Sequence, residues 1–534
     1  MTDQLTRLAV AAPLPPARSG VAAYVARQLP ELSRRLEVIL AVADPAAVDP
    51  SLAADHRIVG LDELGSLDVD AVLYHLGNST ECLDVARAID EGRPGVVLAH
   101  DLSIHHLVSY VGLGLDHPDE YAAALETAFG DRGRRLAELR IAGERGEAEL
   151  ALFDLVGPLL RRHRAVVVHS TWGAGLVRRR APGVPVAVVP HFAPEPVPPL
   201  DRIQLGLPLG ASLVGVLGNA VPAKRPDVVL GAVRRLVDRG RAVHVVVGGR
   251  DGTDGELAVL IDELGLGEHA TVTGWLSDRD LRALAGTLDA VVALRSPHLG
   301  ESSGPVPMTA VAGTPLVAWP VGSFADLPPD AYVAAPVGGD EVGDLADALD
   351  ELLANPARAA VVGAKARRWA LDELAVERCV DRLVSAVAAA PEDVPDEVEI
   401  DRPWGPLIGR RRPGRAVVTG GNDDDADALR AAGWLVRPVA GAPGMSEAPV
   451  GWADLVVWRV RSDEHIDRAA LDGLHRGVHP AGRLVVRVPT ERLSLVIAKA
   501  LDSAGFGAGG LDQLEPVRLG GESVLTAVKV GAPR

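Results

Sequence analysis

The sequence predicts an α/β protein in which two consecutive Rossmann-like units are followed by a smaller α/β unit. Short apolar runs alternate with amphipathic segments of helical spacing, which is typical of parallel strands covered by helices on both faces. The 534 residues are enough for roughly three or four domains. A stretch rich in proline and charge over 391–415 is expected to be a linker before the last unit.

The first unit is expected over residues 1–192. Its strand candidates are uninterrupted apolar runs: LAVAA (8–12), LEVILAV (36–42), AVLYHLG (71–77), GVVLAHD (95–101), AVVVHS (165–170) and VAVVPHF (186–192). Residues from about 112 to 163 lack such runs and show helical spacing, so we expect a helical insertion there.

The second unit is expected over 193–390 and the third over 416–534. Strand candidates of the second are SLVGVLG (212–218), AVHVVVGGR (242–250), ATVTGWL (270–276), AVVALR (290–295), PLVAWP (315–320) and AYVAAP (331–336). Those of the third are RAVVTGG (415–421), WLVRPV (434–439), ADLVVWRV (453–460), GRLVVRVP (482–489) and ESVLTAVKV (522–530).

The composition of the chain excludes several classes of protein function. The formal net charge is -18, which argues against general nucleic-acid binding. Two cysteines cannot form a disulfide framework or a cysteine-based zinc site. The N-terminus lacks the apolar core of a signal peptide, and prolines interrupt the longest uncharged stretch, over 302–325. We therefore expect a cytoplasmic protein.

Ligands of such folds bind at the carboxyl ends of the strands, so the loops there are the first candidates for a site. The loop PLPPARSG over 13–20 ends in Gly20. Glycine allows close approach of a ligand, and the helix that follows offers free N–H groups to an anion. The alternative interpretation is a proline-rich turn.

A second loop, LGNAVPAKRPDVVL over 217–230, contains Asn219, Lys224 and Arg225 just before a predicted helix. A lysine beside a helix N-terminus suits a phosphate group by charge and by donor geometry. The alternative is a lysine that only faces solvent.

A third loop, LRSPHLGESSG over 294–304, carries an acid among small residues. Glu301 can accept hydrogen bonds from sugar hydroxyls, and the small Ser302, Ser303 and Gly304 expose backbone N–H groups to a pyrophosphate. Alternatively, these residues only cap the next helix.

On the first unit, His100 and Asp101 follow a strand, and His75 and Asn78 follow its neighbour. A neutral imidazole at His100 could orient an acceptor hydroxyl or a donor sugar. A metal site built from His100, His105 and His106 is the less favoured alternative, because no acidic partners accompany them. We expect no metal and no cofactor.

Taken in order, the motifs resemble glycosyltransferase family 4, the retaining GT-B enzymes. The order is PLPPARSGVAAY (13–24), HST (169–171), VVPH (188–191), the lysine loop, GWLSD (274–278) and GESSG (300–304) before AGTP (312–315). The resemblance covers about 8–390. It implies that Lys224 binds the donor diphosphate, Glu301 faces the donor sugar, Gly20 closes on the phosphates, and His100 lies near the sugar.

Two positions depart from the family pattern. Thr309 stands where the family usually has a second glutamate, which holds the nucleotide ribose, and Asn219 stands where an arginine is common. Losing a charge-assisted hydrogen bond typically costs about 1.5–3 kcal/mol. Arg295 is a candidate for the replacement positive charge.

The resemblance implies a retaining transferase that moves a sugar from a nucleotide-diphosphate donor to a hydroxyl-bearing glycan or lipid-linked acceptor. Transient association with a membrane is left open. The alternative is a catalytically inactive GT-B scaffold or sugar-binding protein. The third unit resembles a degenerate class I methyltransferase, in which the G-x-G loop and the ribose-binding acid are missing, and we expect it to be noncatalytic.

Overall fold

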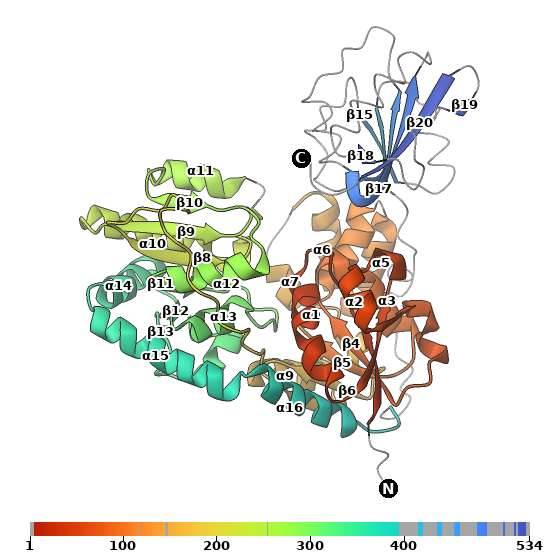
Figure 1. Cartoon of the computed structure of the whole chain (residues 1–534), viewed down its shortest axis with the longest axis horizontal. Helices are drawn as coiled ribbons and strands as arrows, with labels where there is room; N and C mark the ends of the chain where they lie inside the picture. The colour runs from red at the N-terminus through yellow and green to blue at the C-terminus, as the bar shows by residue number, and fades with distance from the viewer. Residues whose placement is uncertain are drawn as a thin grey trace. The chain divides into compact units, whose positions relative to one another are not determined.

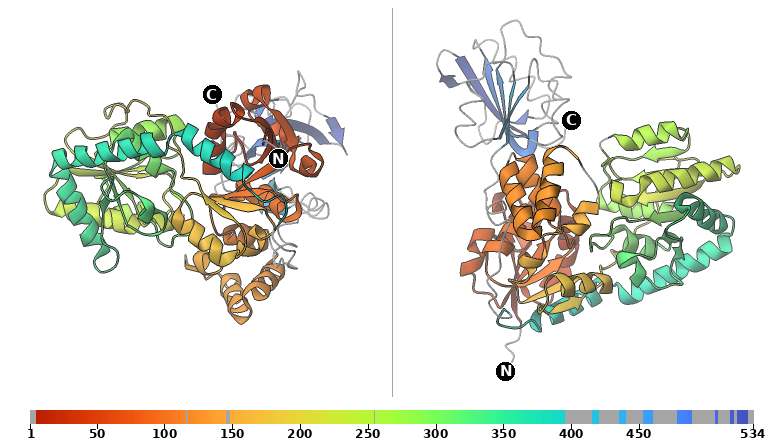
Figure 2. Two further views of the ribbon diagram at one scale, coloured as in Figure 1. Left: turned by 90° about the horizontal axis from the view of Figure 1, so that it is seen from below. Right: turned by 180° about the vertical axis from the view of Figure 1, so that it is seen from behind.

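The computed structural model describes residues 5–115, 117–144, 148–253 and 255–394, together with the strands of the C-terminal unit. The chain divides into two compact units, Met1–Gly409 and Arg410–Arg534. The first unit contains two parallel sheets, with helices packed against them (Figures 1 and 2). The predicted α/β fold with two Rossmann-like domains is therefore confirmed.

The first sheet has seven parallel strands in the order β3-β2-β1-β4-β5-β6-β7. Their bounds are β1 (Arg7–Ala11), β2 (Glu37–Val42), β3 (Arg57–Gly60), β4 (Ala71–Leu76), β5 (Val96–Ala99), β6 (Ala165–Val168) and β7 (Val186–Val188). Five of them lie within the predicted apolar runs, and β1 begins one residue before its run. The prediction omits β3, because four residues that begin with an exposed arginine carry too weak a pattern.

The helices of the first domain connect these strands. Ser19 starts α1, because its side chain accepts a hydrogen bond from the backbone N–H of Ala22. The helices are α1 (Gly20–Ser33), α2 (Pro50–Asp55), α3 (Leu83–Glu91), α4 (His105–Ser109), α5 (Pro118–Phe129), α6 (Asp131–Ile141), α7 (Ala148–Leu152), α8 (Gly157–Leu160) and α9 (Thr171–Arg180). Helices α5 to α8 occupy the stretch between β5 and β6 for which a helical insertion is predicted.

The second sheet has six parallel strands in the order β10-β9-β8-β11-β12-β13. They are β8 (Ser212–Leu217), β9 (Val243–Gly248), β10 (Ala270–Val272), β11 (Ala290–Ala293), β12 (Leu316–Ala318) and β13 (Val333–Ala334). The helices are α10 (Pro226–Asp238), α11 (Glu256–Glu263), α12 (Asp278–Thr287), α13 (Pro305–Ala312), α14 (Glu341–Leu353), α15 (Pro356–Glu373) and α16 (Val376–Ala388). Within the described ranges, no helix has the length and apolar character required to cross a membrane.

Both faces of the second sheet are covered, and β8 shows how. Val214 and Val216 belong to the apolar cluster beneath α10 and α14, whereas Leu213 and Leu217 belong to the cluster beneath α12 and α13. Since neighbouring residues of a strand point to opposite faces, a strand covered on both sides must be apolar throughout. This explains the uninterrupted apolar runs of the sequence.

Helix α16 packs on the first domain rather than on the second. Its buried residues Cys379, Val380 and Leu383 belong to the same cluster as Leu32 of α1 and Leu8 of β1. The predicted boundary at residue 390 groups this helix with the second sheet. The difference has a physical reason, because the spacing of apolar residues shows that a helix has a buried face but not which sheet covers it.

The loops at the carboxyl ends of the two sheets touch one another. The N–H of Leu102, after β5, donates to the carbonyl of Leu299, after β11, at 3.0 Å. Arg27 of α1 and Asp278 of α12 form an ion pair at 3.0 Å. The carboxyl edges therefore face each other, and the loops singled out in the sequence meet between the sheets.

The C-terminal unit contains a further sheet in the order β15-β14-β16-β17-β20-β18, with β19 paired to β20. Its strands are β14 (Arg415–Thr419), β15 (Leu435–Val439), β16 (Ala453–Arg459), β17 (Val478–Val488), β18 (Phe506–Gly507), β19 (Val517–Leu519) and β20 (Glu522–Lys529). The first four strands in this order pair in parallel, and the pairings of β20 are antiparallel. Residues 395–414 of the predicted linker, and the predicted loop after β14, lie outside the described residues.

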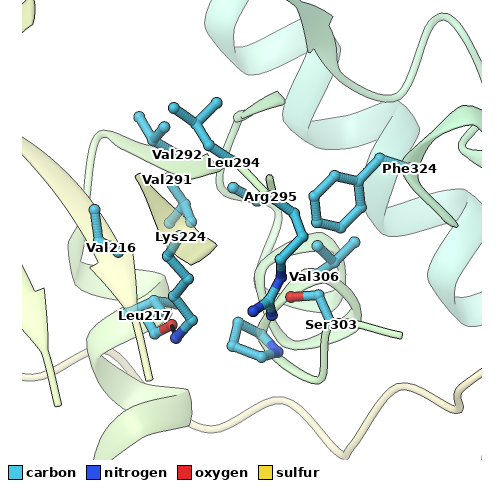
Figure 3. Close-up of a pocket in the computed structure, with 12 residues that line it drawn as sticks. Val216, Leu217, Lys224, Val291, Val292, Leu294, Arg295, Ser303, Val306 and Phe324 are labelled. Atoms are coloured by element: carbon cyan, nitrogen blue, oxygen red, sulfur yellow. Dashed lines mark hydrogen bonds between the residues drawn. The ribbon is translucent and has the colours of Figure 1, made fainter. Parts of the chain in front are cut away.

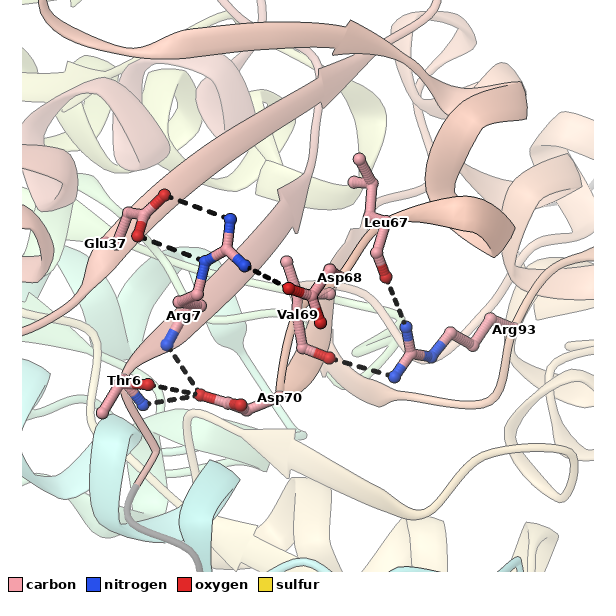
Figure 4. A network of polar contacts seen from close by, with 8 residues as sticks. All are labelled: Thr6, Arg7, Glu37, Leu67, Asp68, Val69, Asp70 and Arg93. Carbon is pink, nitrogen blue, oxygen red and sulfur yellow. Dashed lines mark hydrogen bonds and ion pairs between the residues drawn. The ribbon is translucent and has the colours of Figure 1, made fainter.

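A polar network fastens the start of β1 to the segment before β4 (Figure 4). One Asp70 carboxylate oxygen accepts from the backbone N–H groups of Thr6 and Arg7, each at 2.8 Å, and from the Thr6 hydroxyl at 2.9 Å. Arg7 pairs with Asp68 at 2.7 Å. Arg93 donates to the carbonyls of Leu67 and Val69 at 3.2 and 3.1 Å.

We expect Asp70→Asn to lower the free energy of unfolding at pH 7 by about 1 kcal/mol, because charge-assisted hydrogen bonds become neutral at a solvent-exposed site. The N–H groups of Arg7 and Thr6 lower the pKa of Asp70, so its contribution is present above the ordinary carboxyl range and fades as pH falls. Urea unfolding at pH 7 and pH 3 measures both effects. Asp68→Asn is the control, since that side chain is 99% exposed; an equal loss in both variants would contradict the assignment.

Candidate functional site

Lys224 lies at the carboxyl edge of the second sheet, at the end of a short 3-10 turn after β8. Its Nζ donates to the carbonyl of Leu217 at 2.8 Å. A Cβ on Gly218, which has a φ of +78°, would lie 2.8 Å from that Nζ. Burial, with the nearby charge of Arg295, lowers the pKa of Lys224 to about 7. Burial therefore disfavours the charge of this amine in the free protein, and an anionic partner would favour it.

Arg295 and Glu301 lie in the loop after β11, next to Lys224. Arg295 Nε is 2.9 Å from Glu301 Oε1, and His298 Nδ1 is 3.4 Å from Glu301 Oε2. The backbone N–H of Leu299 donates to the same Oε2 at 2.6 Å. Burial alone would raise the pKa of Glu301, but the contacts with His298 and Arg295 outweigh it and lower the pKa. Glu301 is thus a fixed, ionised carboxylate.

Three of the predicted donor-site residues line one pocket. Lys224, Arg295 and Ser303 surround it, with Val306 and Phe324 on its apolar side (Figure 3). In Figure 3, the Arg295 guanidinium and the Ser303 hydroxyl lie close to each other, with the ammonium of Lys224 across the pocket. The pocket combines two cations with a serine in front of α13, an arrangement that suits phosphate oxygens.

The residues around Ser303 start α13. Ser302 and Ser303 also line a second cavity between the two domains. Gly304 immediately precedes the helix, and a Cβ on it would lie 3.6 Å from His191 Nε2 of the first domain. Small residues at these positions keep the backbone of this loop close to both domains.

Thr309 does not face the pocket. It is fully buried, and its hydroxyl donates to the carbonyl of Pro305 at 2.9 Å, within α13. The predicted hydrogen bond from Thr309 to a donor is therefore corrected. Thr309 lies one helical turn after Pro305, so its hydroxyl can donate to a backbone carbonyl of its own helix.

Asn219 and Arg225 are engaged elsewhere. The Asn219 side-chain oxygen accepts from the N–H of Arg250 at 3.2 Å. Arg225 has a left-handed φ of +52° and pairs with Asp227 at 2.9 Å and Glu341 at 3.0 Å. Two carboxylates therefore hold Arg225 in the free protein, and its binding to a donor stays a prediction.

Gly20, predicted to approach the donor phosphates, is the first residue of α1. Its φ is not positive, and a Cβ built on it would meet no atom within 4 Å. The packing of the protein therefore does not require glycine at this position, which leaves space above the helix N-terminus for a ligand.

His100 sits in the middle of a chain of three histidines. His169 Nδ1 lies 2.9 Å from the carbonyl of Val189, which can only accept, so this nitrogen carries the proton. His169 Nε2 then accepts from His100 Nδ1 at 3.2 Å, and His100 Nε2 accepts from His75 Nδ1 at 3.1 Å. Burial lowers the pKa of His169 to about 4 and that of His75 to about 3, and it holds the pKa of His100 well below its ordinary value.

The histidine chain changes the role expected for His100. Both of its ring nitrogens are used within the first domain, so the predicted hydrogen bond to a sugar or acceptor hydroxyl is corrected. His75 is fully buried, and its Nε2 has no partner among the described residues. His105 contacts Phe153 and Tyr121 through its two ring nitrogens, which leaves neither for a metal.

Asp101 is the acceptor-side residue whose chain neighbour contacts the loop after β11. Its Oδ2 accepts from the backbone N–H of Asn78 at 2.9 Å. Burial and the negative charge of Glu301 raise its pKa to about 6, while Arg295 opposes the shift. The N–H of the adjacent Leu102 donates to the carbonyl of Leu299 at 3.0 Å, so Asp101, from the first sheet, lies close to the loop that carries the Arg295–Glu301 pair.

Four residues of this region are absent from the predicted site. His298 stands three positions before Glu301 and could have been noticed from that spacing. Arg18 and Trp275 stand within the quoted motifs PLPPARSG and GWLSD but were not singled out, and only the structure brings them together with Arg250.

Two facing α/β domains with parallel sheets define the class of protein to which this fold belongs, the GT-B proteins. The fold is similar to that of sucrose-phosphate synthase from Thermosynechococcus elongatus, with a TM-score of 0.51 and 17% identity over 71% of this chain and 98% of that one. Anabaena Alr3699/HepE in complex with UDP-glucose gives a TM-score of 0.50 and 15% identity, over 72% and 99% of the two chains. At these identities the likeness shows a shared fold.

Residues 199–369 match the family described as Glycosyl transferases group 1. This range contains Lys224, Arg295, Glu301 and Ser303. D-inositol 3-phosphate glycosyltransferase from Mycobacterium avium (strain 104) is 38% identical over 172 residues, which is 31% of this chain and 39% of that protein. The protein of that name from Mycobacterium tuberculosis (strain F11) is 38% identical over 159 residues, 28% and 32% of the two chains. The matches thus span about a third of the length of these curated relatives.

Proposed function

We propose that this protein is a glycosyltransferase that moves a sugar from a nucleotide-diphosphate donor to a hydroxyl acceptor, with retention of the anomeric configuration. The observation that carries the proposal is the pocket in which Lys224, Arg295 and Ser303 adjoin the fixed carboxylate of Glu301. The two cations and the serine match a diphosphate, and the carboxylate matches the hydroxyls of a sugar.

The chemistry follows from the charge that develops. When the bond between the anomeric carbon and the phosphate oxygen breaks, the leaving diphosphate gains negative charge, and Lys224 and Arg295 are placed to stabilise it. Contact with the diphosphate also restores the charge of Lys224, because an anion raises a lysine pKa that burial has lowered.

Retention follows from attack on the face that the diphosphate leaves. The acceptor oxygen bonds to the anomeric carbon, and its proton passes to the departing phosphate oxygen. Glu301 is not offered as a nucleophile, because Arg295 and His298 hold its carboxylate and lower its pKa. We assign it to binding the donor sugar. The proposal requires neither a metal nor an organic cofactor.

Asp101 is assigned to the acceptor. It comes from the opposite sheet, and only one of its carboxylate oxygens has a hydrogen bond to the described part of the chain. An ionised carboxylate at this place accepts a hydrogen bond from the acceptor hydroxyl and orients it toward the anomeric carbon.

The relatives support a nucleotide sugar as donor. A structure with the same fold holds UDP-glucose, and the curated relatives are named as glycosyltransferases. We propose a hydroxyl-bearing glycan or lipid-linked acceptor, a cytoplasmic location with transient membrane contact, and a noncatalytic methyltransferase-like C-terminal unit.

The test is hydrolysis of a panel of UDP-, GDP- and ADP-sugars by the full chain. We expect slow release of sugar from one donor, and loss of at least 90% of this rate in Glu301→Gln, because a neutral amide cannot replace the carboxylate between Arg295 and the sugar. Glu351→Gln, on the exposed face of α14, is the matched control and should retain the rate.

A noncatalytic sugar-binding scaffold is the second candidate, and the burial of Thr309 favours it. A folded protein that binds none of the donors would overturn the transferase. Binding without hydrolysis in the presence of simple glycoside acceptors would favour the scaffold. Binding of S-adenosylmethionine would overturn the noncatalytic assignment of the C-terminal unit.

A further inference from the structure

Two arginine side chains from different domains lie near the ring of Trp275. The guanidinium carbon of Arg18 is 5.7 Å from the centre of the indole, and that of Arg250 is 5.1 Å away. Arg18 belongs to the loop before α1, whereas Arg250 and Trp275 follow β9 and β10. Trp275 is 46% exposed. Among the described residues, no acid forms an ion pair with either arginine.

The backbone of Arg250 is held against the lysine loop. Its N–H donates to the Asn219 side-chain oxygen at 3.2 Å, and its carbonyl accepts from the N–H of Ala220 at 2.9 Å. A Cβ on Gly249 would lie 2.5 Å from the carbonyl carbon of Gly218, so glycine is required for this close approach. The turn at Gly218 and Asn219 therefore fixes the position of the Arg250 backbone, from which its side chain extends.

Lys224 contacts the same turn through its side chain. A Cβ on Gly218 would come within 2.8 Å of Lys224 Nζ, so the lysine passes directly over this glycine. Arg250 and Lys224 thus both contact the turn formed by Gly218 and Asn219. An arginine side chain extends several ångströms from its Cα. The guanidinium of Arg250 can therefore reach a diphosphate that Lys224 binds.

The order of the strands extends the argument along the edge of the sheet. In the order β10-β9-β8-β11, the loops carry in turn Trp275, Arg250, Lys224 and the Arg295–Glu301 pair. An aromatic residue and cations come first, and the acid comes last. A nucleotide sugar has the same sequence of chemical parts, with the base and diphosphate before the sugar.

We propose that Arg250 is a donor-binding residue, whose guanidinium contacts the nucleoside-diphosphate part of the donor beside Lys224. Arg18 approaches the same ligand from the first domain, held by the face of Trp275. Asn219 is a positioning residue, because its side-chain oxygen accepts a hydrogen bond from the backbone N–H of Arg250. The neutral side chain at position 219 thus fixes the backbone from which the cationic side chain of Arg250 extends. This inference rests on the proposed function and names further residues of the same site.

The test is calorimetric titration of the full chain with UDP, GDP and ADP. For the nucleotide that binds, we expect Arg250→Ala to raise Kd at least tenfold and to make the salt dependence of binding less steep, since one charged contact is removed. Arg250→Lys should give an intermediate Kd, because the charge stays while the planar donor is lost. Arg241→Ala, at the other end of β9, is the matched control with an unchanged Kd.

The outcomes separate this inference from the proposed function. Loss of nucleotide binding in Lys224→Met with an unchanged Kd in Arg250→Ala would overturn the role of Arg250 and leave the transferase standing. A wild-type protein that binds none of the three nucleotides would overturn both. Thermal unfolding of each variant shows whether the change in Kd reflects the site, and equal effects of Arg250→Ala and Arg241→Ala would also count against the proposal.

Discussion

Replacement of Lys224 by methionine is expected to lower the rate of sugar transfer by about 10²–10³-fold, the loss typical of removing one preorganised group from a developing negative charge. Methionine keeps the length and apolar stem of the side chain and removes the ammonium. The loss should appear mainly in kcat, because the leaving diphosphate carries more charge in the transition state than in the bound donor. Steady-state kinetics with the donor identified in the panel measures it.

The same variant should be more stable than the wild type when no donor is present. The native pKa of Lys224 is about 7, below the ordinary value for lysine, so the buried charge disfavours folding wherever the native lysine is protonated. This cost is full below about pH 7 and is relieved as pH rises toward 10.5, where the unfolded chain also loses the proton. Methionine removes the cost of the buried charge, but the Leu217 carbonyl then lacks its hydrogen-bond donor. The net increase in the free energy of unfolding is expected to be on the order of 1–3 kcal/mol at pH 6.

Donor binding provides an independent measurement for Lys224. At pH 8 the free lysine is mostly neutral, and a bound diphosphate raises its pKa, so we expect uptake of close to one proton per nucleotide bound. Calorimetry in buffers of different ionisation enthalpy measures this number, which should fall to near zero in Lys224→Met. Lys365→Met removes an exposed lysine paired with Asp330 and should change neither rate nor proton uptake. Equal proton uptake by wild type and Lys224→Met would show that Lys224 is not the group that meets the phosphate.

Replacement of Asp101 by asparagine is the second change with a large expected effect. The rate of transfer should fall about 10–100-fold, because a neutral amide oxygen forms a weaker hydrogen bond with the hydroxyl of the acceptor substrate than a carboxylate does. The wild-type pKa of about 6 predicts that activity declines below pH 6 as Asp101 takes up a proton, and this acid limb should disappear in the variant. The pH profile of kcat/KM for the acceptor measures the effect. An acid limb that stays at the same pH in Asp101→Asn would rule out the assignment.

The stability of Asp101→Asn should change in the opposite direction. Burial and Glu301 raise the native pKa of Asp101, so the stability that its protonated form contributes is present below the ordinary carboxyl range and is lost as pH rises through about 6. Asparagine does not ionise, and the variant should gain on the order of 1–3 kcal/mol at pH 8 and little at pH 4. Asp55→Asn, at the exposed end of α2, is the control for a change of charge without burial.

The sequence was sufficient for the sheets and for the place of the loops that form the candidate site, because both depend on local order along the chain. A strand covered on both faces must be apolar throughout, and this pattern is visible without coordinates. Lys224 and Glu301 each follow such a strand, and the carboxyl ends of parallel strands meet at one edge. Lys224, Arg295 and Ser303, predicted from separate loops, accordingly line one pocket.

The predicted site residues that contact other partners share a different cause. Arg225 and Lys224 are adjacent in sequence, but a left-handed turn at Arg225 sends its side chain to Asp227 and Glu341. Thr309 turns its hydroxyl to its own helix, and His100 gives both ring nitrogens to neighbouring histidines. In each case, a partner distant in space or a backbone angle decides what the side chain can still contact.

The sequence by itself determined the alternation of strands and helices, and it located the loops that carry the cations and the acid of the candidate site. Only the tertiary structure decided which side chains remain free for a ligand. It showed the return of α16 to the first domain and the neutral chain of histidines, and it placed the backbone of Arg250 against the turn that Lys224 contacts. The physical reason is that burial and hydrogen-bond partners arise from residues far apart in the chain, whereas periodicity and loop position are local properties.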